Sequence, residues 1–274
     1  MEVTVADQKI FMVSTLVSVD TAVEAAERNR VAAFGQVSRL MNRSKAEEIS
    51  LSPVEKRFDP LWHVVARKHL VFDRTKRYHV PASDGTVKVV TFQGVDYQVN
   101  DGRYTLQGLD HCEEDITVET VVDAVTGAQV QAAPIIGAPR AEIGTEMRSD
   151  DASVVPPEVK ASGLIQRLLH SLITPYEADE VFEETIEVSQ VDLVYHPSYM
   201  FEATWPSKGK TSLIQVDGVT GEVDLDVKLR LQGIRGVITR DVLLDIGTET
   251  FNMVVPGGAI ALRLGRAIVE RGRD

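Results

Sequence analysis

The sequence predicts an α+β protein built from two related helix-plus-antiparallel-sheet units with a C-terminal helix. A helix-forming stretch near the start is followed by β-branched and aromatic runs, and this order of elements recurs after residue 158. The pattern Val-Asp-x-Val-Thr-Gly also stands twice, at 122–127 and 216–221. Two matched features in the same order are what a repeated unit leaves in a sequence.

The first unit is predicted to cover residues 1–130. Residues 9–17 favour a strand, and a helix is expected from Asp20 to Met41, with apolar residues at helical spacing. From about residue 48 the chain becomes β-branched and aromatic, with Gly, Asp and Asn as turn residues. The predicted strands are short: 61–66, 69–72, 77–80, 87–92, 95–99, 104–106 and 116–122.

The second unit is predicted to cover residues 159–274, after a linker or strap at 131–158 that holds four of the 11 prolines. Its order of elements matches that of the first unit. We expect helices at 159–173 and 177–185, strands at 186–195, 199–205, 211–216 and 222–231, and a helical tail from residue 240.

A second match supports the repeat. Residues 54–66 can be laid on residues 191–203 without a gap, which places Pro60 on Pro197. A proline within a strand pattern indicates an edge, a bulge or a strand start. More residues separate Pro60 from Asp123 than separate Pro197 from Asp217. The first unit must therefore carry an insertion within residues 68–110.

The two Val-Asp-x-Val-Thr-Gly motifs predict hairpin turns. Asp123 and Asp217 can accept hydrogen bonds from backbone N–H groups, while Gly127 and Gly221 supply the left-handed conformation. The alternative is that the aspartates bind a metal. No further carboxylates stand at the spacing of a calcium loop, so we favour turns.

Residues 177–223 resemble a PepSY-type domain. The resemblance rests on Tyr199-Met-Phe-Glu-Ala-Thr, followed by Ser212-Leu-Ile-Gln-Val-Asp-Gly-Val-Thr-Gly-Glu-Val. It implies a small α+β module that binds or restrains protein partners and has no catalytic residues. Domains of that family usually lie outside the cytoplasm, behind a signal or a membrane anchor.

Composition indicates a soluble cytoplasmic protein. The net charge of −12 argues against a general binder of nucleic acid or anionic membranes. Cys112 is the single cysteine, so no intramolecular disulfide can form, as is common in a reducing compartment. The N-terminus does not read as a secretory signal, and no segment has the roughly 20 apolar residues of a spanning helix.

The search for catalytic chemistry is mostly negative. Nucleotide-binding, nucleophile-elbow, zinc-protease and CxxC motifs are absent from the sequence. His63, His69 and His79 share one β-rich stretch and are conceivable metal ligands, although histidines on half-exposed strands are common. His111 and Cys112 are adjacent and would face opposite sides of a strand, so His111 is poorly placed to activate the thiol. We expect no catalytic residue, metal or cofactor.

Two segments, 67–79 and 259–274, are candidate interaction surfaces. The first carries candidate anion contacts and interleaved aromatics, and such a combination can bind single-stranded nucleic acid. The candidate anion contacts are Arg67, Lys68, Arg74, Lys76 and Arg77. A solvated edge protected by charge is the interpretation we prefer.

The predicted C-terminal helix at 259–274 is amphipathic. It has an apolar stripe of Ile260, Leu264 and Ile268, with Arg263 and Arg266 beside it. The stripe is expected to lie on its own domain, on a protein partner or second copy of the chain, or on a membrane surface.

The function expected from these features is that of a non-catalytic interaction or regulatory protein, bound to a partner or forming a homo-oligomer. The alternatives are a hydrolase-like enzyme with a cleft between the two units, and a single-stranded nucleic-acid binder acting through residues 67–79. Facing carboxylates and a histidine in one deep pocket would favour the enzyme, and a flat apolar patch would favour the interaction protein.

Overall fold

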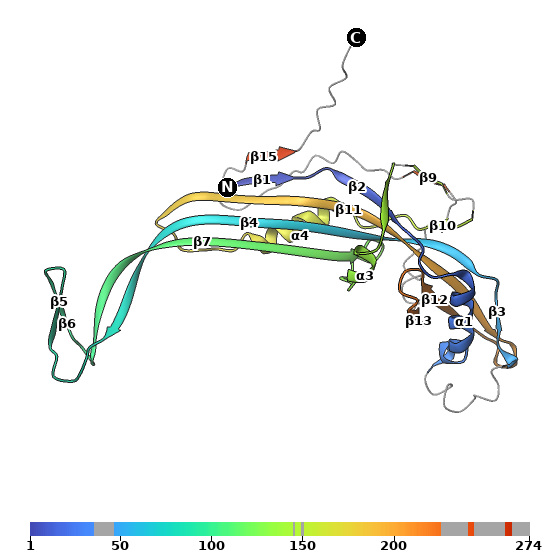
Figure 1. The fold of residues 1–274 in the computed structure, drawn as a ribbon, viewed down its shortest axis with the longest axis horizontal. Helices are drawn as coiled ribbons and strands as arrows, with labels where there is room; N and C mark the ends of the chain where they lie inside the picture. The colour runs from blue at the N-terminus through green and yellow to red at the C-terminus, as the bar shows by residue number, and fades with distance from the viewer. Residues whose placement is uncertain (36–46, 145, 149–150, 226–240, 244–260, 265–274) are drawn as a thin grey trace, which may run out of the picture.

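The computed structural model describes residues 1–35, 47–144, 146–148, 151–225, 241–243 and 261–264. It is 54% strand and 17% helix, so the protein is mostly β. Eleven strands form one mixed sheet (Figure 1). The predicted α+β class, with two separate helix-plus-antiparallel-sheet units, is therefore wrong: the strands of both halves pair directly and share one sheet, part of which is parallel.

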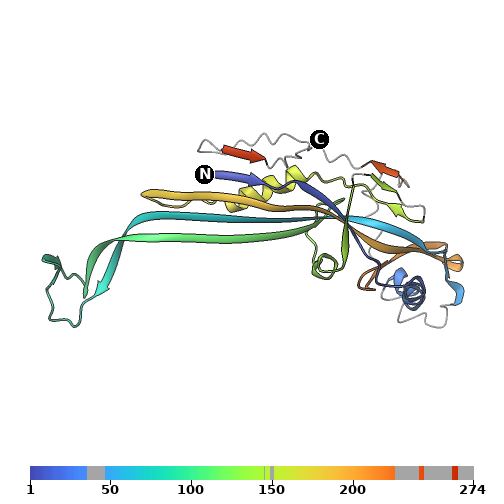
Figure 2. The same cartoon turned by 45° about the horizontal axis from the view of Figure 1, so that its top comes forward.

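Three long antiparallel strands form the body of the sheet: β4 (Glu55–Pro81), β7 (Arg103–Asp123) and β11 (Glu180–Trp205). They lie side by side in the order β7, β4, β11 (Figures 1 and 2). Shorter strands were predicted here because charged residues interrupt the β-branched runs. In the structure these charges are paired across the ladder, as in Arg67 with Asp115, so the strands continue through them.

The remaining strands are short. Those in the main sheet are β1 (Glu2–Val5), β2 (Gln8–Val13), β3 (Ser50–Leu51), β8 (Arg140–Ile143), β10 (Ser153–Val154), β12 (Lys210–Asp217), β13 (Val223–Asp224) and β15 (Ala261–Leu264). Two small separate sheets pair β5 (Val89–Phe92) with β6 (Val95–Gln98), and β9 (Glu146–Arg148) with β14 (Asp241–Leu243). The predicted strap at 131–158 thus contributes α3 and three strands.

The helices are α1 (Val19–Asn29), α3 (Ala133–Ile136) and α4 (Ala161–Leu172), with 3₁₀ turns η1 (Ala32–Phe34) and η3 (Pro206–Lys208). The α1 helix begins at Ser18, whose hydroxyl accepts a hydrogen bond from Thr21 N. It ends at Asn29, earlier than the prediction, and residues 36–41 of the predicted helix lie outside the described residues. The helix predicted at 177–185 is wrong, because this segment begins β11 and pairs with β4 from Glu180.

The two long helices pack on different parts of the sheet. The α4 helix packs its leucines on β4 and β11, in the cluster that contains Trp62 and Val64. The α1 helix, which precedes β4, packs on the β11–β12 hairpin around Tyr199 and Phe201. The helix of the first half therefore covers strands of the second half.

Matching hydrogen bonds anchor the two helices. Trp62 Nε1 donates to Val159 O at 2.7 Å, two residues before α4 begins. Tyr199 OH donates to Val17 O at 2.7 Å, two residues before α1 begins. In the sequence match of 54–66 with 191–203, Trp62 corresponds to Tyr199, so the two anchors are equivalent.

The prolines and turns of the two halves also occupy equivalent positions. Pro60 O accepts from Ala124 N at 3.0 Å, and Pro197 O accepts from Gly218 N at 2.8 Å. The residues just before the two prolines, Asp59 and His196, pair with each other across β4 and β11. A local two-fold relation between the halves therefore passes through this pair.

The two turns have the same internal bonds. Oδ1 of Asp123 accepts from the N–H groups of the second and third residues after it, at 2.9 and 2.8 Å. Oδ1 of Asp217 does the same, at 2.8 Å for both. Gly127 and Gly221 have φ of 73° and 75°, so the predicted left-handed conformation is confirmed at both.

The predicted C-terminal helix is wrong at the four residues of this segment that the structure describes. Residues Ala261–Leu264 form β15, which pairs in parallel with β1. Pairing with an available strand outweighs local helix propensity, and Ala-Leu-Arg-Leu also alternates as a strand does. Arg263 and Leu264 thus belong to a strand, while Ile260, Arg266 and Ile268 fall outside the described residues.

The turn geometry makes Gly221 sensitive to substitution. We expect Gly221→Val to lower the free energy of unfolding by more than about 1 kcal/mol, because a β-branched residue is strained at positive φ. Urea denaturation measures the change. Gly144→Val is the matched control, since an added Cβ there meets no atom within 4 Å and φ lies outside the left-handed region. Equal losses in both variants would contradict the turn assignment.

Candidate functional site

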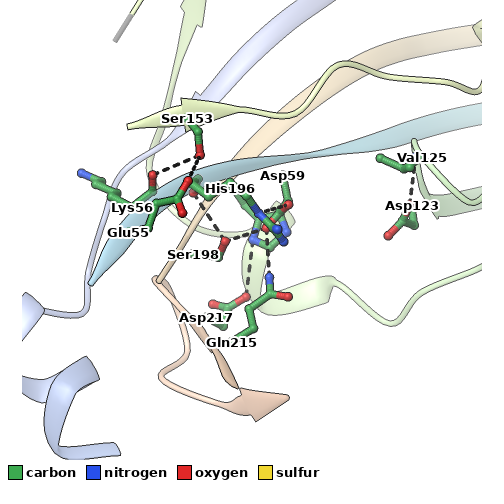
Figure 3. Close-up of polar contacts among 11 residues, drawn as sticks. Glu55, Lys56, Asp59, Asp123, Val125, Ser153, His196, Ser198, Gln215 and Asp217 are labelled. Carbon is green, nitrogen blue, oxygen red and sulfur yellow. Dashed lines mark hydrogen bonds and ion pairs between the residues drawn. The ribbon is translucent and has the colours of Figure 1, made fainter. Parts of the chain in front are cut away.

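A pocket of about 400 Å³ lies where the two repeats meet. Its lining includes the central pair, Asp59 and His196, and both turn aspartates, Asp123 and Asp217. In Figure 3, Asp59, His196 and Asp217 converge, while Asp123 lies apart from them. The site is formed by strands from both halves, so its position follows from the two-fold relation.

Asp59 is the most heavily bonded group in the pocket. Its carboxylate lies 2.8 Å from Arg57 Nε, and it accepts hydrogen bonds from Ser198 Oγ at 2.6 Å and from Gln215 Nε2 at 2.9 Å (Figure 3). Arg57 is only 5% exposed. A buried guanidinium is tolerated when a carboxylate neutralises it, so this ion pair fixes the floor of the pocket.

His196 faces Asp217. The distance from His196 Nδ1 to Asp217 Oδ2 is 3.4 Å, which is an ion-pair separation, and Nδ1 has no hydrogen-bond partner in the described structure. Burial would raise the pKa of Asp217, but His196 and the N–H groups of Thr220 and Val219 outweigh burial and hold this pKa below its usual value. Asp217 is therefore ionised at neutral pH.

Equivalent positions of the two halves hold different types of residue beside the pocket. Ser198 and Gln215 lie beside the pocket from the second repeat, and the equivalent positions of the first repeat hold Leu61 and Val121. Leu61 belongs to a small apolar cluster with Val194, which is the counterpart of Arg57. The pocket is therefore lined by polar residues of both halves and by apolar residues such as Leu61.

The pocket brings together carboxylates and a histidine, as the enzyme alternative requires. A nucleophilic serine would have to donate its hydrogen bond to the histidine. Ser198 is fully buried and donates to Asp59 instead. Ser198 therefore lacks the histidine partner that a nucleophilic serine needs.

The basic strand is largely neutralised. Arg67, Lys68 and Arg74 pair with Asp115, Glu114 and Asp110 on β7, and Lys68 is 1% exposed. Lys76 and Arg77 are exposed and have no ion pair within the described part of the chain. Because alternate residues of a strand face opposite sides, these five cations do not share one face for a nucleic acid.

The histidines of β4 do not meet. His63 bonds to Glu119 and Gln190, His69 lies between Asp115 and Glu183, and His79 bonds to Thr105. His63 and His69 are roughly 20 Å apart along the strand. Among the residues that the structure describes, no three His, Cys, Asp or Glu side chains form a metal-binding group.

His111 and Cys112 have separate partners. His111 Nδ1 lies 2.7 Å from Asp73 Oδ1, while Cys112 Sγ contacts Asp110 O at 3.9 Å. Neighbouring residues of β7 face opposite sides of the sheet, so the histidine does not contact the thiol.

One feature that sequence analysis missed is the outer edge of β7. Among the strands that the structure describes, β7 pairs with β4 alone, and its last residues are covered by bonds such as Val130 N to Val121 O. Ala124 N donates to Pro60 O, and hydrogen-bonded pairs alternate along an antiparallel ladder. The odd-numbered residues from Thr105 to Glu119 therefore direct N–H and C=O away from β4. We call this segment the open edge.

No protein-family model, curated protein or solved structure matches this chain. The PepSY resemblance therefore stays a prediction. Within the described residues, no helix combines the length and apolar character needed to cross a membrane.

The lowered pKa of Asp217 predicts a pH dependence. Because the pKa is lower in the folded state, ionised Asp217 stabilises the protein at neutral pH, and this contribution is lost as pH falls through and below the ordinary value of 3.8. Urea denaturation at several pH values should show that Asp217→Asn and His196→Gln each reduce the fall in unfolding free energy between about pH 5 and pH 2. Thr220→Val changes the same turn without changing charge and should keep the wild-type slope.

Proposed function

We propose that this protein is a non-catalytic binding protein that accepts an extended strand of a partner along the open edge of β7. The observation that carries this proposal is the long row of backbone donors and acceptors from Thr105 to Glu119 that have no partner among the described residues. Addition of a strand to an exposed sheet edge is a common mode of peptide recognition. Main-chain bonds supply affinity, and neighbouring side chains supply selectivity.

The open edge is protected against strand addition by charge alone. Natural edge strands are shortened, bulged, interrupted by proline or charged. The β7 strand has 21 residues, contains no proline and pairs with β4 without a register shift. Such an edge can form a hydrogen bond at each outward-facing group, with a net contribution of about 1 kcal/mol for each bond.

The charge of β7 indicates the chemistry of the partner strand. Residues 110–119 hold five acidic side chains and no Lys or Arg. A second β7 beside the first would place these like charges opposite one another, which is destabilising. A strand with Lys or Arg would place cations favourably beside these acidic side chains. Cations of β4 already pair with three of them, Asp110, Glu114 and Asp115. We therefore infer an extended partner segment carrying basic residues.

The projecting part of the hairpin supports the same proposal. Beyond Asp73, which pairs with the first residue of β11, β4 and β7 continue as a two-stranded ribbon with β5 and β6 at its tip (Figures 1 and 2). A two-stranded ribbon is marginally stable in water. Leu109 is 54% exposed on this ribbon. A third strand would add hydrogen bonds and cover apolar surface.

The test uses synthetic peptides of alternating Lys and Val, with alternating Glu and Val as the charge control, followed by fluorescence anisotropy. The basic peptide should bind, and binding should weaken as salt increases. Thr117→Pro removes one outward N–H and should weaken binding about tenfold or more, whereas Thr117→Val keeps the N–H and should bind like the wild type.

Circular dichroism must show that both variants are folded. Equal binding by folded Thr117→Pro, or equal binding of the acidic peptide, would overturn the proposal.

A further inference from the structure

We propose that the β5–β6 hairpin at the end of the ribbon inserts its turn into the surface of a lipid bilayer. This inference concerns a different part of the molecule from the open edge and does not depend on it. The hairpin forms a two-stranded sheet of its own and lies at the far end of the long axis of the molecule (Figures 1 and 2). At its base Tyr97 lies against Tyr104 of β7, with ring centroids 6.2 Å apart.

The turn end of the hairpin exposes apolar side chains. Gln93 and Gly94 form a two-residue turn, and both have positive φ, as in a type I′ hairpin. Phe92 and Val95 pair directly behind this turn and therefore share one face of the hairpin. They are 49% and 53% exposed. None of these four residues is charged, so the turn can leave water without desolvating an ion.

The chemistry along this face changes in the order found across a membrane surface. Behind the exposed apolar pair, the next pair on the same face is Val90 with Tyr97. The pair after that is Lys88 with Val99, joined by the bond from Val99 N to Lys88 O at 2.9 Å. Successive rows are about 7 Å apart. Apolar side chains suit hydrocarbon, tyrosine suits the level of the headgroups, and a lysine can extend its ammonium to the phosphates.

The acid nearest to the turn does not oppose insertion. Asp96 follows Val95 and therefore faces the other side of the hairpin. There it pairs with Thr91, whose Oγ1 donates a hydrogen bond to the Asp96 carboxylate at 2.7 Å. Insertion of the turn by about 5–10 Å reaches the boundary between headgroups and acyl chains, where water still solvates such a group.

The exposed patch is too small for a specific interface with a protein. An aromatic side chain buries about 150–250 Å² when it is fully covered, so Phe92 offers about 100 Å², and Val95 offers less. A stable interface buries about 800 Å² on each partner. A bilayer needs no matching surface, because its hydrocarbon accepts any apolar side chain that reaches it. The ribbon holds the hairpin away from the body of the sheet, where a bilayer can meet it (Figure 2).

The experiment is sedimentation of the full chain with vesicles of palmitoyl-oleoyl phosphatidylcholine. One myristoyl chain gives an association constant of about 10⁴ M⁻¹, and we expect the turn to bind no more tightly than this, so lipid is used at about 10 mM. The wild type should sediment with the vesicles. Phe92→Ser should lower the association constant about tenfold or more, and Val95→Ser should lower it less. Phe92→Leu keeps an apolar side chain and should restore most of the binding.

Leu109→Ser is the matched control. Leu109 is 54% exposed, more than either hairpin residue, but it lies on the ribbon and not at the turn. This variant should bind vesicles like the wild type. Circular dichroism must show that all variants are folded.

Tryptophan fluorescence provides a second measurement if a serine variant fails to fold. Trp62 and Trp205 are buried, so Phe92→Trp adds an exposed indole at the turn. On addition of vesicles its emission should shift to shorter wavelength, and brominated lipid should quench it. Leu109→Trp should show neither change.

The proposal is overturned if the wild type does not sediment with vesicles, if folded Phe92→Ser binds as the wild type does, if Leu109→Ser loses as much binding, or if the emission of Phe92→Trp stays unchanged. It is also overturned if light scattering without lipid shows an oligomer that Phe92→Ser disrupts, because the hairpin then contacts a second copy of the chain. Binding of the basic peptide at the open edge should be the same in Phe92→Ser and the wild type, so the two proposals can fail separately.

Discussion

The structure depends on the antiparallel pairing of β4 with β11. This ladder runs from Asp73 opposite Glu180 to Phe58 opposite Pro197, with two irregularities, and it joins the two halves of the chain into one sheet. Its register places Asp59 opposite His196 and puts the two prolines on either side of that pair. A slip of one residue would turn every side chain to the wrong face, so the register is strongly specified by the buried side.

The same register determines where each helix packs and where the pocket forms. Trp62 of β4 and Tyr199 of β11 correspond in the sequence match, and each anchors the segment that leads into a helix. The turns at Asp123 and Asp217 are held by the carbonyl oxygens of the two prolines. The pocket then gathers residues from five strands, the turns and α3 because they are positioned from one ladder. Polar residues of both halves line it, and Ser198 beside it has an apolar counterpart, Leu61.

Sequence analysis predicted features that depend on a few neighbouring residues. The two turns follow from Asp and Gly at fixed spacing, and the start of α1 follows from local capping and helix-forming residues. The lengths of β4 and β11 could not be predicted in this way, because Arg67, Lys68 and Glu183 are acceptable in a strand only when partners such as Asp115, Glu114 and His69 lie beside them. The sequence around Leu264 has helical spacing as well as strand alternation, and its pairing with β1 explains why it forms a strand. The pocket could not be predicted without the register between two segments that lie 137 residues apart in the sequence match. Sequence analysis did single out each of its two turn aspartates.

The packing of α1 on the second half has a consequence for how the chain is made. The bond from Tyr199 to Val17 joins residues 182 positions apart, and α1 has its apolar face covered only after β11 and β12 exist. Proteins dominated by such distant contacts fold slowly, because the entropy of closing a long loop precedes any gain from contacts. During synthesis the N-terminal helix therefore waits for the second half. Until residue 217 has left the ribosome, the apolar face of α1 lacks the strands that cover it, and exposed apolar surface of this kind promotes aggregation.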